Sequence, residues 1–336
     1  MKSKKPIIIS LAPFQGLTDK YFRTLFLESF GGVDRVYAPF VSGSGTERIS
    51  KSKLSDLLMN ERAISGTIPQ IISNDSDEIV LFGKTLSDYG YRHINWNLGC
   101  PFRRIANKNK GCGLLPYPGK LEKILDNIFD KQPSFELSIK TRLGYHQKDE
   151  IFEAIKLFNQ YPLSELIIHP RIGKQLYKGV VNLEGFNQCK LLSDHSIVYN
   201  GDIYNKAAFE KLLVMFSDIE HWMMGRGLLI NPFLAEQIKG QKVSKDQRRE
   251  RLHKFIKRLM DITSNRISNE SKAAGYMKAV CYYMAGSFKD PEKVFSKIKK
   301  TRTTEEFDNA FNEIINLPLS NDVEAGNYFV HGLKHI

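Results

Sequence analysis

The side chain with the clearest chemical potential stands just after a short apolar run. Cys100 follows Asn97 by three residues and lies between Gly99 and Pro101, in a polar loop where core packing gives little reason to keep a thiol. A free thiol has a pKa of about 8.5, so at neutral pH it is mostly protonated and can serve as a proton donor as well as a nucleophile. Cys112, between two glycines, is the second choice for this role.

Seven other short apolar runs also end in polar or small residues. The eight runs are residues 7–12, 35–39, 68–72, 93–97, 136–140, 165–169, 196–200 and 220–225. They alternate with amphipathic stretches, which is the pattern of β-α-β units and a parallel sheet. In a parallel β/α barrel the active site is built at the C-terminal ends of the strands. The pattern therefore predicts a (β/α)8 TIM barrel, and the insertions at 41–57 and 103–118 predict substrate-contacting loops at its mouth.

The groups at these strand ends suit a flavin mononucleotide (FMN). Lys140 can stabilise negative charge on a flavin ring, the Gln70 and Asn97 amides can bind ring carbonyls and N–H groups, and His169 can hold the ring or ribityl chain. A lone lysine is more often in a salt bridge and a lone histidine more often in the core, so the prediction depends on their convergence. The expected cofactor contacts are Pro13, Phe14, Gln70, Asn97, Lys140, His169, Asn200, Gly201, Asp202, Gly225 and Arg226.

Glycines follow the last two runs, in Gly201-Asp202 and in Gly225-Arg226-Gly227. The loops after the seventh and eighth strands of a barrel commonly hold a phosphate against backbone N–H groups. Arg226 can bind such a group through two parallel hydrogen bonds. Either loop alone is weak evidence, but both at the expected strand ends predict a phosphate site.

The length of 336 residues suits a barrel of about 250 residues with a smaller partner. Strand-like alternation ends after Arg226, and apolar residues then recur at helical spacing. We expect a catalytic barrel over 1–238, a small all-α helical bundle over 239–320 and a tail over 321–336. Four scattered cysteines without a CxxC pair argue against disulfides and a metal site, and no apolar run approaches the about 20 residues of a membrane span. We expect a cytoplasmic protein that binds no membrane.

Charge is concentrated in one segment. The chain has 49 Lys and Arg against 37 Asp and Glu, and 18 of the basic but only 6 of the acidic residues lie between Lys239 and Arg302. The remainder holds 31 of each sign. A basic helical segment beside a neutral barrel indicates contact with a polyanion such as RNA, although a solvated helical face would have the same composition. We expect Arg248, Lys254 and Lys278 at the RNA.

Six ordered motifs resemble the tRNA-dihydrouridine synthase family over nearly the whole chain. They are residues 12–19 with Phe22-Arg23, residues 97–101 with Gly111 and Leu114-Leu115, residues 140–144, His169-Pro170-Arg171 with Gln175, Tyr177 and Gly179, residues 200–203, and residues 224–227 with Asn231-Pro232. The family usually has Met at the position of Phe14 and Gly at that of Pro170. Together the six motifs are far more specific than any one of them.

The resemblance implies reduction of the uracil C5–C6 double bond in RNA, most often tRNA. Hydride would pass from reduced FMN to C6 and a proton from Cys100 to C5, with NADPH or NADH as the reductant. The resemblance also places Asn97, Arg142, Arg171, Gln175 and Tyr177 against the target nucleotide, in a protein that we expect to be a monomer. Two alternatives are an FMN-dependent barrel oxidoreductase for a small molecule, which would not need the basic domain, and an inactive RNA-binding homologue, which would not need Cys100.

Overall fold

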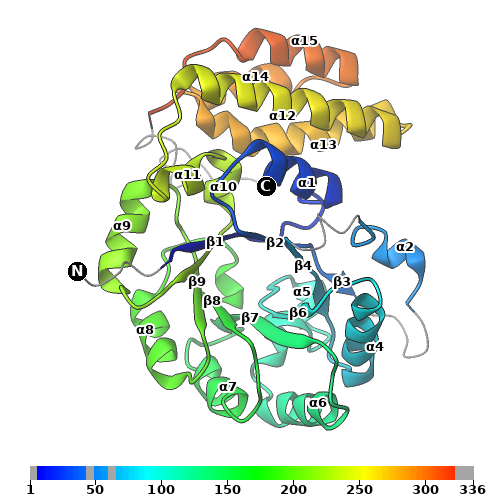
Figure 1. Cartoon of the computed structure of the whole chain (residues 1–336), viewed down its shortest axis with the longest axis vertical. Coiled ribbons are helices and arrows are strands. Elements are labelled where there is room, and N and C mark those ends of the chain that lie inside the picture. The colour runs from blue at the N-terminus through cyan, green and yellow to red at the C-terminus, as the bar shows by residue number, and fades with distance from the viewer. Residues whose placement is uncertain (1–5, 43–48, 60–65, 322–336) are drawn as a thin grey trace. The chain divides into compact units, whose positions relative to one another are not determined.

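The computed structural model describes residues 6–42, 49–59 and 66–321 (Figure 1). Part of the predicted 41–57 loop and nearly all of the predicted tail lie outside these residues. The described residues include ten strands of one sheet. The chain divides into two compact units: residues 1–34, 202–218 and 224–336 form one, and residues 35–201 and 219–223 form the other. We call them the first and the second unit.

The second unit is a curved layer of parallel strands covered by helices. Its strands are β2 (Arg35–Tyr37), β3 (Val41–Ser42), β4 (Thr67–Ile68), β5 (Gln70–Ile72), β6 (His93–Leu98), β7 (Glu136–Gly144), β8 (Leu166–Ile172), β9 (Ile197–Asn200) and β10 (His221–Met224). The order is β3-β5-β6-β7-β8-β9-β10, and β2 pairs with β4. Figure 1 shows α4 (Ser76–Ser87), α6 (Pro118–Asp130), α7 (Glu150–Phe158) and α8 (Leu183–Leu192) outside the strands. This is the β/α barrel class that the sequence predicts.

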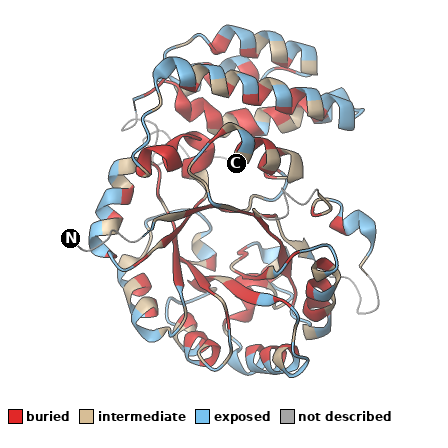
Figure 2. Cartoon of the chain, viewed as in Figure 1, coloured by how far each residue is buried: buried red, intermediate tan, exposed pale blue. Residues whose placement is uncertain are grey.

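Strand register brings the polar strand ends together. Asn97 on β6 pairs with Lys140 on β7, and Arg142 on β7 pairs with His169 on β8. Figure 2 shows the strands of this unit almost entirely buried, whereas the helices that cover them are buried on one face and exposed on the other. The sheet core therefore holds the predicted site residues in fixed neighbouring positions.

One predicted strand is divided in two. The apolar run 68–72 contains Pro69, which has no N–H to donate to a sheet ladder. The run therefore forms β4, which pairs with β2, and β5, which pairs with β3 and β6. The strand β3 lies inside the stretch that the sequence predicts as a loop, because Val41 and Ser42 align with Ile71 and Ile72.

The first unit contains the strand β1 (Ile8–Leu11) and eight helices of the described residues. The helices are α1 (Lys20–Ser29), α9 (Lys206–Met215), α10 (Arg226–Ile230), α11 (Leu234–Ile238), α12 (Lys245–Arg266), α13 (Glu270–Met284), α14 (Pro291–Ile298) and α15 (Thr304–Ile314). The helices α12–α15 form the bundle expected from the helical spacing. Phe255 of α12 packs against Phe22, Phe26 and Phe30 at ring distances of 5.1–6.3 Å. This aromatic cluster attaches α12 to α1.

A buried polar cluster occupies the N-terminal ends of strands in the second unit. The Glu165 carboxylate accepts hydrogen bonds from Tyr37 and from His221 Nδ1 (3.1 Å), and Arg35 lies 3.4 Å away. Burial alone would raise the pKa of Glu165, but the hydrogen bonds and charge of His221 together with the Tyr37 hydroxyl lower it to about 2. The carboxylate thus stabilises the folded state only while it is ionised.

We predict that Glu165→Gln lowers the free energy of unfolding at pH 7 by about 3 kcal/mol, because His221 and Arg35 lose their buried counter-charge. The folded-state pKa lies below the usual unfolded value of about 4.3, so this contribution is complete above that value and is lost as pH falls towards 2. Urea titrations between pH 7 and pH 3 measure both effects. Glu153→Gln, in an exposed pair with Lys156, should cost less than about 1 kcal/mol, and an equal cost for both variants would contradict the prediction.

Candidate active site

Cys100 is held in place by the end of β6. The Asn97 side-chain oxygen accepts hydrogen bonds from the backbone N–H groups of Gly99 (3.0 Å) and Cys100 (2.9 Å). Cys100 is 6% exposed. Burial raises the pKa of its thiol, although a backbone hydrogen bond from Phe102 and the charge of Arg142 act in the opposite direction. The thiol is therefore protonated at neutral pH, as a proton donor must be.

Gly111 and Cys112 support the Cys100 backbone. Gly111 has a φ of +58°, and a Cβ atom there would lie 2.6 Å from the Cys100 carbonyl oxygen. The Cys112 backbone N–H and thiol both donate to that oxygen at 3.2 Å. Burial raises the pKa of Cys112 to about 12. Cys112 is thus a packed and protonated support for the loop, and its position offers no access for chemistry.

The amides that the sequence assigns to a cofactor are linked in one chain. Asn97 Nδ2 donates to Gln70 Oε1 (2.7 Å), Gln70 Nε2 donates to Asn95 Oδ1 (2.7 Å), and Asn95 Nδ2 donates to Ser138 (2.8 Å). All of these residues are buried. Since each amide is oriented by its neighbour, the remaining N–H groups of Gln70 and Asn97 have set directions. On β9, Asn200 Nδ2 donates to the Met223 carbonyl at 2.9 Å.

Lys140 is the charged residue beside this amide chain. Among the residues that the structure describes, its ammonium group has no hydrogen-bond or ion-pair partner. Enclosure by protein and the nearby positive charge of Arg142 lower its pKa to about 7. The Lys140 side chain is half-buried, and a cation with no acceptor among the described residues fits a ligand that brings a carbonyl or an anionic atom. This observation shows that the residues present suit a flavin ring.

Two buried arginines hold the loop that follows β8. Arg142 Nε donates to Gly99 O (3.0 Å), and its Nη1 donates to the carbonyls of Ile172 (3.2 Å) and Leu176 (2.7 Å). Arg171 Nη2 donates to Gly179 O at 2.6 Å. Both guanidinium groups are almost fully buried, so much of their hydrogen-bonding capacity serves the backbone.

Arg171 also orients His169, whose Nε2 lies 3.1 Å from Arg171 Nη1. A guanidinium can only donate, so His169 Nε2 accepts and Nδ1 carries the ring proton. The Gln175 side chain accepts from the backbone N–H of Ile172 at 2.8 Å. Tyr177 is 45% exposed, and its ring lies 5.4 Å from the Arg142 guanidinium. Of the expected substrate contacts in this loop, Tyr177 is the one that the loop presents outward.

Three of the residues assigned to phosphate binding, Asp202, Gly225 and Arg226, belong to the first unit. Arg226 Nη2 lies 2.9 Å from Asp202 Oδ1, and the guanidinium stacks 5.1 Å from the Tyr204 ring. A Cβ atom at Gly227 would lie 1.9 Å from the Ile203 carbonyl oxygen, so only glycine allows this close approach. Residues 202–204 and 225–227 therefore pack together around Arg226.

Comparison with known families decides which reaction class this site serves. A sequence profile described as Dihydrouridine synthase (Dus) matches residues 10–317. The chain belongs to the dihydrouridine synthase family. The match includes the Cys100 loop, Lys140, the loop after β8 and the Arg226 loops.

Similar proteins in other organisms include two tRNA-dihydrouridine synthases. The chain is 25% identical over 326 residues, 94% of this chain and 97% of the relative, to a tRNA-dihydrouridine(16) synthase of Neisseria meningitidis serogroup A. It is 28% identical to tRNA-dihydrouridine synthase B of Pasteurella multocida over 67% of each chain. Among solved structures, 2-naphthoyl-CoA reductase matches with a TM-score of 0.51 at 11% identity, over 68% of this chain and 50% of that chain. That similarity concerns the fold alone.

The two departures from the usual family motifs have local explanations. Phe14 lies against Gly225, where a Cβ atom would come within 3.0 Å of its ring, and Tyr283 contacts it edge-on at 5.8 Å. The glycine leaves room for the ring. Pro170 lies where the β7–β8 register shifts, and its carbonyl accepts from Asn182 at 2.7 Å. A proline is tolerated at such an irregularity because no ladder N–H is needed there.

The segment 239–302, which its sequence marks as basic, uses many of its basic residues in internal contacts. Arg248 is buried and donates to Ser320 O (3.4 Å), Lys278 donates to Thr301 O (2.7 Å), and Lys254 pairs with Glu250. Six other basic side chains pair with acids outside the 239–302 segment. These pairs are Lys239–Asp34, Arg251–Glu236, Lys257–Asp308, Arg258–Glu28, Arg266–Asp19 and Lys297–Glu313. The charge count therefore overstates the positive charge that this segment offers to a polyanion.

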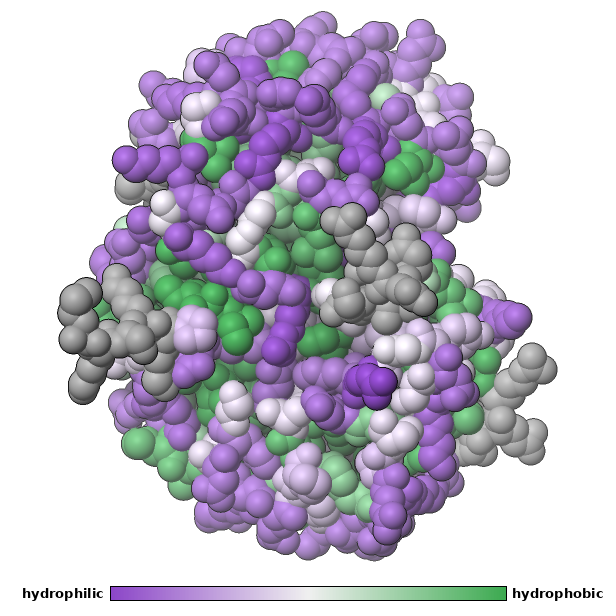
Figure 3. Space-filling model, in the orientation of Figure 1, coloured by the Kyte–Doolittle hydropathy of each residue, from purple (hydrophilic) through white to green (hydrophobic). Residues whose placement is uncertain are grey.

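Other basic residues of this segment, not Arg248, Lys254 or Lys278, are exposed and have no ion pair among the described residues. Lys272, Lys293, Lys299 and Lys300 are exposed and form no ion pair with the residues that the structure describes. The face of the helical bundle in view in Figure 3 is mostly hydrophilic. Sequence reasoning chose Arg248, Lys254 and Lys278 because the charge pattern does not show which side chains already have partners.

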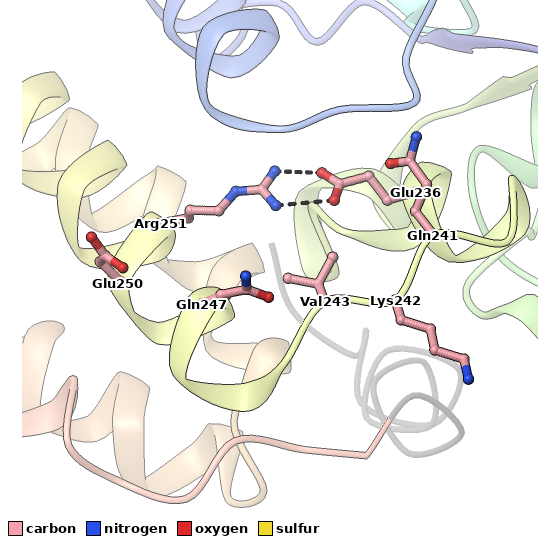
Figure 4. Close-up of a pocket in the computed structure, with 7 residues that line it drawn as sticks. All are labelled: Glu236, Gln241, Lys242, Val243, Gln247, Glu250 and Arg251. Atoms are coloured by element: carbon pink, nitrogen blue, oxygen red, sulfur yellow. Dashed lines mark hydrogen bonds and ion pairs between the residues drawn. The ribbon is translucent and has the colours of Figure 1, made fainter.

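A cavity of about 370 Å³ lies in the first unit, and none of the predicted cofactor residues lines it. Figure 4 shows Arg251 pointing to Glu236 through two contacts, while Lys242 extends away from this pair. The arginine charge is thus already compensated. In the described part of the chain no three His, Cys, Asp or Glu side chains cluster to hold a metal ion, and no helix is long and apolar enough to cross a membrane.

We predict that Gly111→Ala displaces the Cys100 loop. The added methyl group meets the Cys100 backbone and the residue keeps a positive φ, so two unfavourable effects combine. Dihydrouridine formation should fall at least tenfold while thermal unfolding by circular dichroism shows a folded protein. The matched control is Gly119→Ala, where a Cβ atom meets nothing within 4 Å. Equal activity in the two variants would show that Gly111 does not set the thiol position.

Proposed function

We propose that this chain reduces uridines in tRNA to 5,6-dihydrouridine, with FMN as its resident cofactor and NADPH or NADH as the reductant. The observation that carries the proposal is a buried thiol at Cys100, whose pKa is raised, in the strand-end loop near Lys140, which has no ion-pair partner among the described residues. Family membership supports the reaction class. The names of the relatives, which specify tRNA, support the substrate class.

Two groups of residues suit different parts of the cofactor. Lys140, Gln70, Asn97 and His169 suit the ring, and Arg226 with its neighbouring loops suits the phosphate. The family chemistry then requires the bound flavin to supply a hydride to C6 of uracil. The contact of His169 Nε2 with Arg171 Nη1 fixes the orientation of the imidazole ring that we propose to face the cofactor.

Cys100 would complete the reduction. When C6 receives the hydride, the electron pair of the C5–C6 bond moves to C5, and the Cys100 S–H bond gives its proton to that carbon. The positive charges of Arg142, Arg104 and Lys140 stabilise the thiolate that remains, and a proton from water restores the thiol. Thus the burial that keeps the acid protonated at rest is balanced by cations that favour the thiolate during the reaction.

Tyr177 and the backbone-bound arginines would receive the target base. A uridine within folded RNA must leave its stack, which costs a few kcal/mol. Tyr177 is exposed and next to a buried guanidinium, so it can contact a base that enters the site. We propose Asn97 as a contact of the same base and the free enzyme as a monomer.

Cys100→Ser tests the acid. It preserves size and hydrogen bonding but raises the pKa of the donor far above that of a thiol, so the proton transfer should slow by about 10²- to 10⁴-fold. Single-turnover oxidation of pre-reduced enzyme by unmodified tRNA transcripts, with dihydrouridine measured by nucleoside mass spectrometry, gives the rate. Reduction of the cofactor by NADPH should be unchanged.

Cys112→Ala is the control for this experiment, because it removes the other thiol of the same loop. The S–H hydrogen bond to Cys100 O is weak, so this variant should react within a fewfold of the wild type. A slow Cys112 variant with a normal Cys100 variant would reverse the assignment. Wild-type protein that forms no dihydrouridine in any tRNA would refute the proposed function.

The exposed lysines of the helical domain should account for part of the salt dependence of RNA binding. Replacing Lys272, Lys299 and Lys300 by Gln removes three positive charges that have no ion-pair partner within the described part of the chain. The slope of log affinity against log salt should flatten by about 0.7–0.9 for each phosphate that the protein no longer neutralises. Filter binding at several salt concentrations measures it. The charge-matched control replaces exposed lysines on the barrel helices, Lys84, Lys123 and Lys211, and equal slopes for both triple variants would exclude this face.

A further inference from the structure

The segment that follows Cys100 has a charge pattern that the net charge of the barrel conceals. Residues 101–121 contain five basic residues, Arg103, Arg104, Lys108, Lys110 and Lys120, and no Asp or Glu. Lys110 lies 3.9 Å from Glu78. The other four are exposed, and none forms an ion pair with any residue that the structure describes. Their positive charge is therefore available to a partner.

Two exposed aromatic residues lie in the same segment. Phe102 is 48% exposed and Tyr117 is 44% exposed, and the Lys120 ammonium lies 4.6 Å from the centre of the Tyr117 ring. Large apolar side chains are usually buried. Aromatic rings exposed among unpaired cations are the combination that binds single-stranded nucleic acid, because bases stack on the rings and phosphates pair with the cations.

The segment is rigidly attached beside the reacting thiol. Phe102 is two residues from Cys100, and its carbonyl accepts from Ile105 and Ala106 at 2.8 and 2.9 Å. Gly113 packs so closely that a Cβ atom would lie 2.3 Å from Ala106 O. Asn74, two residues after β5, donates to Lys108 O at 3.0 Å. The surface is thus formed before any ligand arrives, which lowers the ordering cost of binding.

We propose that Phe102, Tyr117 and the exposed cations around them form an RNA-docking surface for the nucleotides that flank the reduced uridine. The inference rests on the proposed function and adds a second RNA contact to that of the helical domain. When a base is extruded, its neighbours lose a stacking partner. Phe102 supplies a replacement surface, and Arg103 and Lys108 bind the phosphates on either side. The charge of Arg104 also reaches the Cys100 thiol, so Arg104 serves both the surface and the acid.

Phe102→Trp and Phe102→Ala test the stacking. The native tryptophans, Trp96 and Trp222, are fully buried, so Trp at position 102 is an exposed fluorescent reporter. Unmodified tRNA transcripts should quench its emission, and its affinity should match the wild type. Phe102→Ala should bind the same RNA about tenfold more weakly, with unchanged cofactor content and NADPH oxidation. An alanine variant of normal affinity together with an unquenched tryptophan would overturn the proposal.

A charge variant tests the cations without touching the acid. The triple variant replaces Arg103, Lys108 and Lys120 by Gln and leaves Arg104 in place. Its slope of log RNA affinity against log salt concentration should be flatter than that of the wild type by up to about two units. Its KM for RNA should rise while kcat stays near that of the wild type. The Lys84, Lys123 and Lys211 triple variant carries the same charge change outside residues 101–121 and should change neither the salt slope nor KM. Identical behaviour of the two triple variants would show that the segment is only solvated surface.

These binding measurements do not need turnover. They therefore distinguish a failure of the proposed function from a failure of the proposed RNA-docking surface. If nucleoside mass spectrometry of wild-type reactions finds no dihydrouridine, the proposed function fails, while quenching and affinity still decide whether the surface binds RNA. If dihydrouridine forms but neither the Phe102 nor the charge variants change RNA affinity, the surface is overturned and the proposed function stands.

Discussion

The guanidinium group of Arg142 binds main-chain carbonyls of two loops that meet at the active site. One is Gly99 O in the loop that carries Cys100, and the others are the carbonyls of Ile172 and Leu176 in the loop that carries Tyr177. A guanidinium is planar and donates in fixed directions, so it sets the spacing of the two loops. Cys100, the proposed acid, and the exposed Tyr177 are therefore held in position by the protein itself, and such preorganisation is where much of an enzyme's advantage over solution lies.

Electrostatics at the thiol follow from the same packing. Burial removes water from Cys100 and keeps its proton in place, and the enclosed Lys140 has a pKa of about 7 because it too has lost water. A cofactor oxygen would give the lysine the acceptor that none of the described residues provides. Proton transfer would give the cations Arg142 and Lys140 a thiolate to stabilise. The site is thus arranged for the charges that appear during reduction rather than for those present at rest.

The net charge of a segment does not show where its positive charge is available to a partner. Ion pairs such as Arg266–Asp19 and Arg258–Glu28 attach α12 to the segment around α1, so these cations serve the architecture. Meanwhile the electrically neutral remainder of the sequence contains a strongly basic stretch after Cys100. Among the described residues, exposed lysines of α13 and α14 and the basic residues that follow Cys100 have no ion pairs, and such surfaces suit a polyanion.

Much of the fold, and the position of the proposed site residues at strand ends, could be predicted from the sequence because the signals are local. Apolar runs that end in Asn97, Lys140 and His169 identify strand ends, and the Cys100 loop is contiguous. Pro69 divides one predicted strand in two, which is also a local effect. The apolar run 68–72 continues across Pro69, however, so the hydrophobic pattern alone does not indicate the division. Tertiary structure alone decides that Arg248 is buried, that Arg226 pairs with Asp202, and that Arg142 and Gln175 bind backbone. Sequence specifies which groups a segment carries, but a long side chain takes its partners from segments distant in the chain, so its role is set only when the chain has folded around it.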